Sequence, residues 1–375
     1  MLPYGRQSVN EDDVAAVSSV LTSDWLTTGP WVQQFEKELA DLAGAAGAVS
    51  VTSGTAALHT AYAALGVGAG DEVVTTPMTF VATASSAALL GATVVFADVC
   101  EDTGNLDPAA VAAAVTDRTA VVAGVDYGGH PIDAEGLRAA VGGRDIALLE
   151  DAAHSIGGSL DGVPVGSLAD VTTFSFFPTK NLTTAEGGAV VALDPDVVQA
   201  AATFKNIGMV KDPARMRARD EGAWFYEVPA FGLNYRLPDV LAALGSNQLR
   251  RLSAFKARRD EIHDRYNAGL AGIDELTLPV TRPGADPTWH LYALRIRDGR
   301  RRELFDHLRA SGIGVQVNYI PAYWHPVFTD QGYQRGMCPV AERFYEQEIS
   351  LPLFPDLSDH DVDRVIDLVR GFVGA

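Results

Sequence analysis

Two side chains that could share one catalytic centre follow apolar runs of the sequence. Asp151 ends the run Ile146–Asp151, whose last two residues are carboxylates, and Lys180 follows the aromatic-rich run Val171–Phe177. Each has an ordinary explanation on its own, because an aspartate at a strand end often caps the next helix and a lysine there is often only solvated. As a pair they can do chemistry, since an amine can attack a carbonyl carbon and a carboxylate can keep a ring nitrogen protonated.

An anion-binding turn is predicted upstream of this pair. Ser53, Gly54 and Thr55 follow the apolar run Ala48–Val51 and precede a helix-compatible stretch. The N–H groups at a helix N-terminus favour an anion, Gly54 allows close approach of the backbone, and Thr55 can both cap the helix and bind phosphate. An ordinary helix cap is the alternative for this tripeptide.

The three features together fit one cofactor, pyridoxal 5′-phosphate (PLP). Its aldehyde needs a lysine, its pyridine nitrogen needs a carboxylate, and its phosphate needs N–H and hydroxyl donors. The sequence supplies Lys180, Asp151 and the Ser53–Thr55 turn for these three needs. It therefore predicts a PLP enzyme with Lys180 as the Schiff-base lysine.

These residues must be positioned by an α/β domain. From about residue 46 to 192, short runs rich in Val, Ala and Ile alternate with longer Ala-rich stretches. Such runs indicate a mostly parallel sheet covered by helices on both faces. Ligands of these sheets bind beyond the carboxyl ends of the strands, which is where Asp151 and the Ser53–Thr55 turn are expected.

The residue pattern changes after Pro238, from short apolar runs to a stretch with many charged residues. The charged stretch from Asp239 to about Ala271 predicts one long connecting helix. Beyond it, alternation predicts a strand at Leu291–Ile296, and helical periodicity predicts helices at Arg301–Ala310 and Asp359–Val373. We therefore predict a large domain over residues 1–245 and a small C-terminal α+β domain over residues 246–375.

Composition narrows the class of protein. A net charge of −19 repels nucleic acid and anionic membrane surfaces, so neither is an expected partner. The longest apolar stretches, such as the one around Val81–Val95, fall short of a membrane span, and Met1–Arg6 leads into no signal-like apolar core. Cys100 and Cys338 have no metal-binding spacing, so no metal site is predicted. The cytoplasm is the expected compartment.

The order and spacing of these segments resemble the DegT/DnrJ/EryC1/StrS family of sugar aminotransferases, within the fold-type I PLP enzymes. The resemblance covers nearly the whole chain. It rests on Thr27–Pro30 with Phe35 and Glu36, Ser53–Leu58, Glu150–His154, Ser175–Lys180, Glu186–Gly188 and Gly232–Leu237. It implies a large domain with a mostly parallel seven-stranded sheet between helices, and a small C-terminal α+β domain.

The resemblance also implies roles for the matched residues. Lys180 would hold the cofactor and act as general base and acid, Asp151 would pair with the pyridinium, and His154 would lie near the ring oxygen. Phe80 would stack on one face of the ring. The phosphate would be bound by the turn and by the strand before the lysine, through Ser53, Gly54, Thr55, Ala56 and Ser175.

Asn234 implies a second copy of the chain. In the family, the Asn-Tyr-Arg segment, here Asn234 to Arg236, reaches the cofactor phosphate of the neighbouring subunit. The protein would then be a homodimer with shared active sites. Plain loop structure is the alternative explanation for Asn234 and Arg236.

The substrates follow from the same resemblance. L-glutamate would donate the amino group, and a nucleotide-linked 4-keto-6-deoxyhexose or its N-acetylamino derivative would accept it. Thr75–Thr83, Val125–Gly129 and Ala185, where many members have glycine, are similar to the pseudaminic acid branch, which makes UDP-4-amino-4,6-dideoxy-N-acetyl-L-altrosamine. Candidate substrate-binding residues are Arg236, His290, Tyr319 and His325, and the stretch Gln316–His325 could also line the acceptor pocket with aromatic and amide groups. Packing in the core or at a domain interface is the alternative for each of them.

Three other functions stay open at this point. The acceptor could be a keto-cyclitol or a 3-keto sugar, which only substrate assays would separate from a nucleotide sugar. A PLP-dependent dehydratase of the family would replace the lysine by histidine, so Lys180 argues against it. A non-catalytic PLP-binding regulator would bind the cofactor without reacting with glutamate.

Overall fold

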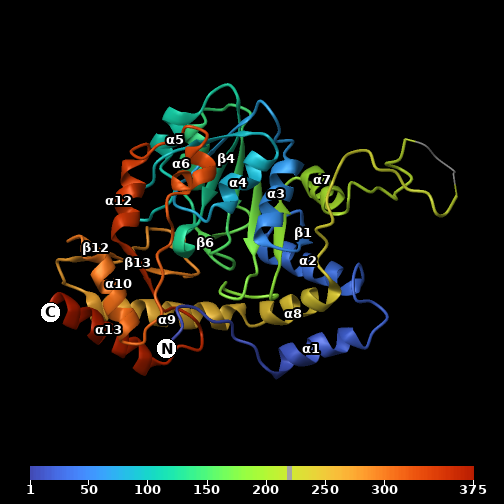
Figure 1. Cartoon of the computed structure of the whole chain (residues 1–375). Helices are drawn as coiled ribbons and strands as arrows, with labels where there is room; N and C mark the ends of the chain where they lie inside the picture. Colours follow the sequence, from blue (N-terminus) through green and yellow to red (C-terminus); the bar gives the residue numbers. More distant parts are fainter. Residues whose placement is uncertain (218–221) are drawn as a thin grey trace.

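The computed structural model describes residues 1–217 and 222–375 and is built around a seven-stranded sheet in the order β1-β9-β8-β5-β4-β2-β3 (Figure 1). β9 is antiparallel to both of its neighbours, and the remaining pairs are parallel. The predicted mostly parallel seven-stranded sheet is confirmed. Its strands are β1 (Gly47–Val51), β2 (Glu72–Thr75), β3 (Thr93–Phe96), β4 (Thr119–Val125), β5 (Ala147–Asp151), β8 (Val171–Ser175) and β9 (Gly188–Ala192).

Alternation along each strand divides the interior into two cores. In β4, Val121 and Ala123 belong to one apolar cluster while Val122, which faces the opposite side, belongs to the other. Burial on both faces explains why these strands read as continuous apolar runs. The helices of this half are α1 (Glu11–Leu21), α2 (Pro30–Ala43), α3 (Gly54–Ala64), α4 (Ala82–Leu89), α5 (Pro108–Ala114), α6 (Ala134–Ala140), α7 (Pro195–Lys205) and α8 (Asp239–Leu249).

The predicted long connecting helix is two helices, so that prediction is wrong in detail. α8 ends at Leu249 and α9 (Leu252–Leu270) begins after a break at Arg250 and Arg251. Arg251 is the N-cap of α9, with φ −101° and ψ −3°, and its guanidinium donates to the buried Asp13 of α1 at 2.9 Å. In Figure 1 the two helices (gold) run along the lower side of the molecule.

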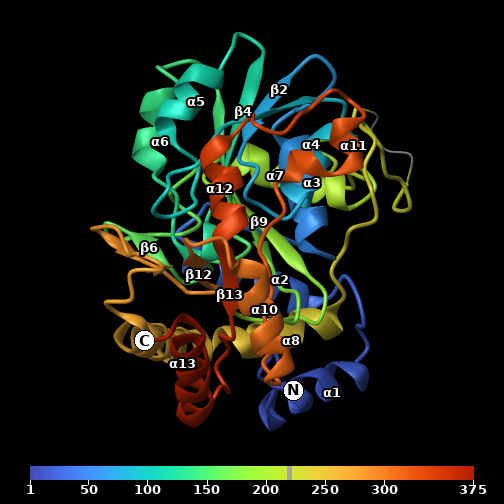
Figure 2. The ribbon, with the colours of Figure 1, turned by 60° about the vertical axis from the view of Figure 1, so that its left-hand side comes forward.

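The C-terminal part has its own apolar core. A three-stranded antiparallel sheet in the order β10-β12-β13 packs with α9, α10 and α13, and Figure 2 shows α10 and α13 beside β12 and β13. The predicted boundary after residue 245 falls within α8, and the division into 1–245 and 246–375 stays a prediction. The elements are β10 (Leu276–Thr277), β11 (Ala285–Asp286), β12 (Tyr292–Ile296), α10 (Arg301–Ala310), α11 (Pro326–Thr329), α12 (Pro339–Gln347), β13 (Glu348–Leu351) and α13 (Asp359–Val373).

A second small sheet joins the two parts. β11 pairs with β6 (Ser159–Leu160), which pairs with β7 (Val163–Pro164).

No helix of the described residues has the length and apolar character that a membrane crossing requires.

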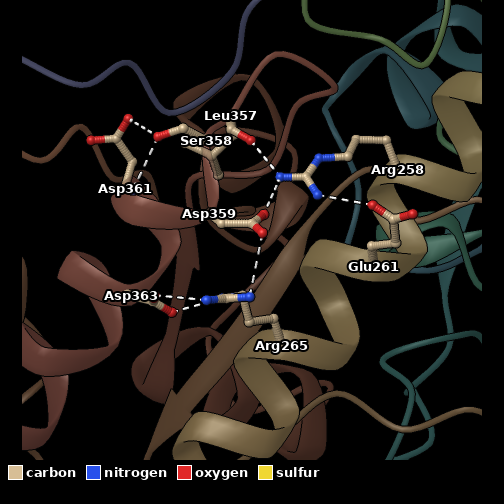
Figure 3. Close-up of polar contacts among 8 residues, drawn as sticks. All are labelled: Arg258, Glu261, Arg265, Leu357, Ser358, Asp359, Asp361 and Asp363. Carbon is tan, nitrogen blue, oxygen red and sulfur yellow. Dashed lines mark hydrogen bonds and ion pairs between the residues drawn. The ribbon is translucent and has the colours of Figure 1, made fainter.

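An exposed ion-pair network fixes the last helix against α9 (Figure 3). Arg258 and Arg265 of α9 both bind Asp359 at the start of α13, and Arg265 also binds Asp363 through two nitrogens at 2.6 and 2.7 Å. Acidic residues at a helix N-terminus are also favoured by the helix dipole. Because the pairs are exposed, salt screens them, and the apolar face beneath them carries most of the stability.

The N-terminal strap, residues 2–5, is an extended segment that adds to the C-terminal domain. The Leu2 N–H donates to Gly312 and its carbonyl accepts from the Gly314 N–H at 2.7 Å, while the Tyr4 carbonyl accepts from Leu353. A Cβ at position 314 would lie 2.8 Å from the Leu2 oxygen, so glycine there permits the close approach. These contacts hold Tyr4, which lies near the N-terminus of the sequence, against the C-terminal part of the chain.

The loop between Lys180 and β9 contains a strained residue. Ala185, where many members of the resembling family have glycine, adopts a left-handed φ of +67°. A Cβ is disfavoured in this conformation by about 1–2 kcal/mol. Alanine in place of glycine at position 185 therefore introduces backbone strain.

We expect Ala185→Gly to raise the free energy of unfolding by about 0.5–1 kcal/mol. Relief of the left-handed strain exceeds the extra chain entropy that glycine adds to the unfolded state. Chemical denaturation would measure the change. Ala271→Gly is the matched control, because Ala271 is exposed with an ordinary φ of −60°. The interpretation is wrong if both variants lose stability alike.

Candidate active site

The carboxyl ends of the parallel strands open into one cavity of about 790 Å³. The ends of β1, β5 and β8 contribute directly, and the segment after β2 and the C-terminal domain close the other sides. Residues named from the sequence that line it are Ser53, Gly54, Thr55, Phe80, Asp151, His154, Ser175, Lys180, His290 and Tyr319. Most of the predicted site thus lies around one space.

Lys180 lies in the loop after β8, where the chain folds back on itself. Its N–H donates to the Phe177 carbonyl at 2.9 Å, and Thr184 and Thr183 both donate to the Phe176 carbonyl to close the loop. The side chain lines the cavity, and burial lowers the pKa of Lys180 to about 8, with the Asp151 charge acting in the opposite direction. An amine in this range can gain and lose a proton near neutral pH.

Asp151 is a buried carboxylate held by two donors. Its Oδ2 accepts from the Thr83 hydroxyl at 2.6 Å, and its Oδ1 accepts from the Ala153 N–H at 3.2 Å. Burial raises the pKa of Asp151, against the effects of Thr83, Ala153 and Lys180. No lysine or arginine of the described chain is within ion-pair distance of it, so a cationic ligand group would find an unpaired carboxylate here.

Glu150, the other carboxylate of the pair, serves the opposite face of the sheet. Its Oε2 accepts from the Thr172 hydroxyl at 2.8 Å and the Gly166 N–H at 3.1 Å, and the residue does not line the cavity. Burial raises the pKa of Glu150 to about 7. Because successive side chains of β5 point to opposite faces of the sheet, Asp151 faces the cavity, whereas Glu150 makes hydrogen bonds within the protein on the other face.

The predicted phosphate turn begins α3. Ser53 is the N-cap and accepts from the Ala56 N–H at 3.1 Å, so the prediction that Thr55 caps this helix is wrong. Thr55 is exposed on the cavity wall and free to bind a ligand. A Cβ at position 54 would lie 2.8 Å from both Cβ and Oγ of Ser175, so glycine is needed for this close approach of the turn to Ser175.

Two neutral histidines form the wall beside Lys180. His154 Nε2 lies 3.1 Å from the Tyr319 hydroxyl, and the His154 and His290 rings are 4.4 Å apart between centroids. Burial lowers the pKa of His154 and of His290 well below that of free histidine, and the Lys180 charge adds to the effect. Both imidazoles are neutral at physiological pH.

The cavity has the donor and acceptor set that PLP requires. His154 Nδ1, His290 Nδ1 and Thr173 Oγ1 are buried, lack a partner within the described chain, and belong to residues that line the space. Buried polar groups without partners are rare unless a ligand or water satisfies them. Together with the helix N-terminal turn at Gly54 and Thr55 and the unpaired carboxylate of Asp151, they match a polar, phosphorylated ring.

Several predicted residues lie elsewhere. Ala56 is buried behind the turn and offers only its backbone, and His325 is half-buried next to α11, outside the cavity lining. Asn234 is exposed, and Arg236 donates to the Asn206 side chain at 2.9 Å; neither reaches the cavity of its own chain. Their predicted contacts with a second copy stay predictions. No group of three or more potential metal ligands occurs in residues 1–217 and 222–375.

Other lining residues were not assigned individual roles from the sequence. Thr83, Thr173 and Tyr4 line the cavity, as do Gln316 and Asn318 of the stretch predicted to line an acceptor pocket. Thr79 and Thr83 have a detectable signal, because hydroxyls four residues apart after a strand fall on one side of a helical turn. Their hydroxyls are 2.7 Å apart.

We expect Thr83→Val to lower the free energy of unfolding of the cofactor-free protein by about 1–3 kcal/mol. The isosteric change removes a hydrogen bond to a buried charged group, and because a donor lowers the pKa of a carboxylate, the pKa of Asp151 rises further. Denaturant unfolding measures the first effect. Thr83→Ser keeps the hydroxyl and should retain most of the stability, and equal stability of the two variants would contradict the assigned contact.

Comparison with known proteins identifies the family. Residues 7–370 match the model of the DegT/DnrJ/EryC1/StrS aminotransferase family. The chain is 40% identical over 378 residues to the spore coat polysaccharide biosynthesis protein SpsC of Bacillus subtilis (strain 168), covering 99% of this chain and 97% of SpsC.

Solved structures agree with the sequence comparison. The sugar aminotransferase Spr1654 of Streptococcus pneumoniae, described as putative and solved in its PMP form, superposes with a TM-score of 0.94 at 30% identity, covering 100% of this chain and 99% of that one. PseC of Helicobacter pylori, an aminotransferase involved in the biosynthesis of pseudoaminic acid, superposes with a TM-score of 0.93 at 29% identity. The match covers 100% of this chain and 99% of PseC. The sequence, the sheet and the site geometry agree, and the chain belongs to the DegT/DnrJ/EryC1/StrS aminotransferase family.

Proposed function

We propose that this protein is a PLP-dependent aminotransferase that moves an amino group from L-glutamate to a nucleotide-linked 4-keto-6-deoxy sugar. One observation carries the proposal: Lys180, the unpaired carboxylate of Asp151, and the turn at Gly54 and Thr55 beside Ser175 line the same cavity. Those are the groups that a lysine-bound, phosphorylated pyridine ring requires.

The residues divide the work. PLP, when bound, supplies an aldehyde for the lysine and an electron-accepting ring. Lys180 accepts a proton from the reacting carbon of the substrate at Nζ and returns it, as its pKa of about 8 allows. Asp151 holds a proton at the ring nitrogen, and Thr83 fixes the orientation of that carboxylate. Thr55 and Ser175 would hold the phosphate, whereas the Ala56 N–H already donates to Ser53 Oγ.

We propose a homodimer with shared sites. Asn234 and Arg236 lie at the base of the segment after α7, where Asn234 pairs with Asn206 and Arg236 pairs with Val51. Described parts of this segment extend away from the body of the molecule (Figure 1). On the described part of this segment, Trp224 and Phe231 are 78% and 98% exposed, and exposed large apolar side chains mark contact surfaces. No arginine lines the cavity within the described chain, so a cationic contact to a diphosphate or a carboxylate would come from Arg236 of a second copy.

The acceptor follows from the relatives. PseC is named for the biosynthesis of pseudoaminic acid and SpsC for that of a spore coat polysaccharide. We propose a UDP-linked 4-keto-6-deoxy-N-acetylhexosamine as acceptor, aminated at C4.

Cys100 and Cys338 are both free thiols, which suits a reducing compartment such as the cytoplasm.

We expect the visible absorbance of the bound cofactor to disappear on addition of L-glutamate and to return on addition of one keto sugar. Lys180→Ala should bind PLP without either change, because it lacks both the attachment point and the proton carrier. Lys37→Ala, which removes an exposed lysine paired with Asp41, is the matched control and should behave as wild type.

The panel of acceptors decides between substrates. It should include UDP- and dTDP-linked 4-keto sugars, a 3-keto nucleotide sugar and a keto-cyclitol. If the absorbance returns with the cyclitol alone, the acceptor is a keto-cyclitol and not a nucleotide sugar. If no amino donor alters the spectrum, the protein binds PLP without acting as a transaminase.

A further inference from the structure

We propose that Tyr4, Gln316 and Asn318 form a neutral polar wall that binds the hydroxyl-bearing ring of the keto-sugar substrate. The inference rests on the proposed function and adds a subsite to it. All three residues line the cavity that contains Lys180, and none of them is among the residues proposed above to hold the cofactor.

Tyr4 reaches the cavity because the N-terminal strap is held at both ends. Leu2 is paired with Gly312 and Gly314, and Leu353 donates to the Tyr4 carbonyl at 3.2 Å. Gly5 packs on the Thr179 side chain, since a Cβ there would lie 3.5 Å from Thr179 Cβ. Tyr4 is thus brought next to the residue that precedes Lys180.

The hydroxyl of Tyr4 is oriented by Asn318. Asn318 Nδ2 donates to the Tyr4 hydroxyl at 2.9 Å, which leaves the phenolic proton free for a ligand. Asn318 is itself fixed on both sides of its backbone, because its N–H donates to the buried Glu348 carboxylate at 2.7 Å and its carbonyl accepts from the Tyr127 hydroxyl. The pair therefore presents a preorganised donor and amide rather than mobile side chains.

The chemistry of this wall suits an uncharged ligand. Burial raises the pKa of Tyr4, so its hydroxyl is a neutral donor at physiological pH. Gln316 and Asn318 add amide groups, the flanking Tyr319 adds an aromatic surface, and His290 is neutral. Amides and phenols pair with sugar hydroxyls and acyl groups, whereas the side-chain carboxylate of glutamate would favour a charge-assisted partner. The wall therefore discriminates between the two substrates of the same site.

The test measures the two half-reactions of the holoenzyme separately. Tyr4→Phe keeps the ring and removes only the donor. With L-glutamate, the rate at which the cofactor absorbance is lost should stay within about twofold of wild type. With the UDP-linked 4-keto-6-deoxy-N-acetylhexosamine, KM should rise about 3- to 10-fold with a smaller change in kcat, as expected for one neutral hydrogen bond. Gln316→Ala should shift KM in the same direction.

Tyr345→Phe is the matched control, because Tyr345 packs under Arg301 and against Trp324 outside the cavity. It should leave both half-reactions unchanged. If Tyr4→Phe leaves the keto-sugar KM unchanged, or slows the glutamate half-reaction as much as the sugar half-reaction, the proposed wall is wrong while the aminotransferase stands. If the wild-type protein aminates no keto nucleotide sugar, the proposed function fails and the wall fails with it.

Discussion

The in-register alignment of the parallel strands is the constraint on which the site depends. β5 pairs with β4 and β8 such that Val125, Asp151 and Thr173 stand at one level, and all three line the cavity. Because the strands end together, a carboxylate at the end of one strand meets residues that are distant in sequence. Asp151 is buried there without a cation, which is unfavourable in isolation and becomes favourable when a positively charged ring nitrogen binds. The lysine loop, the phosphate cradle and the histidine pair are arranged around that carboxylate.

Much of the fold and of the cofactor site could be predicted from the sequence because the signals are local. The apolar runs mark the strands, and the helices at Arg301–Ala310 and Asp359–Val373 match α10 and α13 in their bounds. Residues that follow strands directly, such as Asp151 and Ser53, could be placed at the sheet edge. Two predictions from local signals were wrong. Ser53 rather than Thr55 caps α3, and the stretch in which periodicity predicts one helix is interrupted at Arg250 and Arg251.

The substrate side of the cavity could not be predicted in the same way, because it is assembled from long-range contacts. Tyr4 and Asn318 are hydrogen-bonded across almost the whole chain, and neither lies at the end of a predicted strand. The pleat places Glu150 and Asp151 on opposite faces of the sheet, so only Asp151, the residue predicted for the cofactor, lines the cavity. The residues proposed to bind the cofactor thus lie at the ends of regular elements, whereas those proposed to bind the acceptor depend on how the C-terminal part and the strap pack against the sheet.

The most direct test of the central claim is to identify the attachment point of the cofactor. The holoenzyme is reduced with borohydride, digested, and its peptides are analysed by mass spectrometry. We predict that the pyridoxyl phosphate mass is found on the peptide that contains Lys180, and on no other lysine. Labelling of a different lysine, such as the half-buried Lys205, or a protein that retains no cofactor on reduction, would contradict the assignment of this cavity as the PLP site.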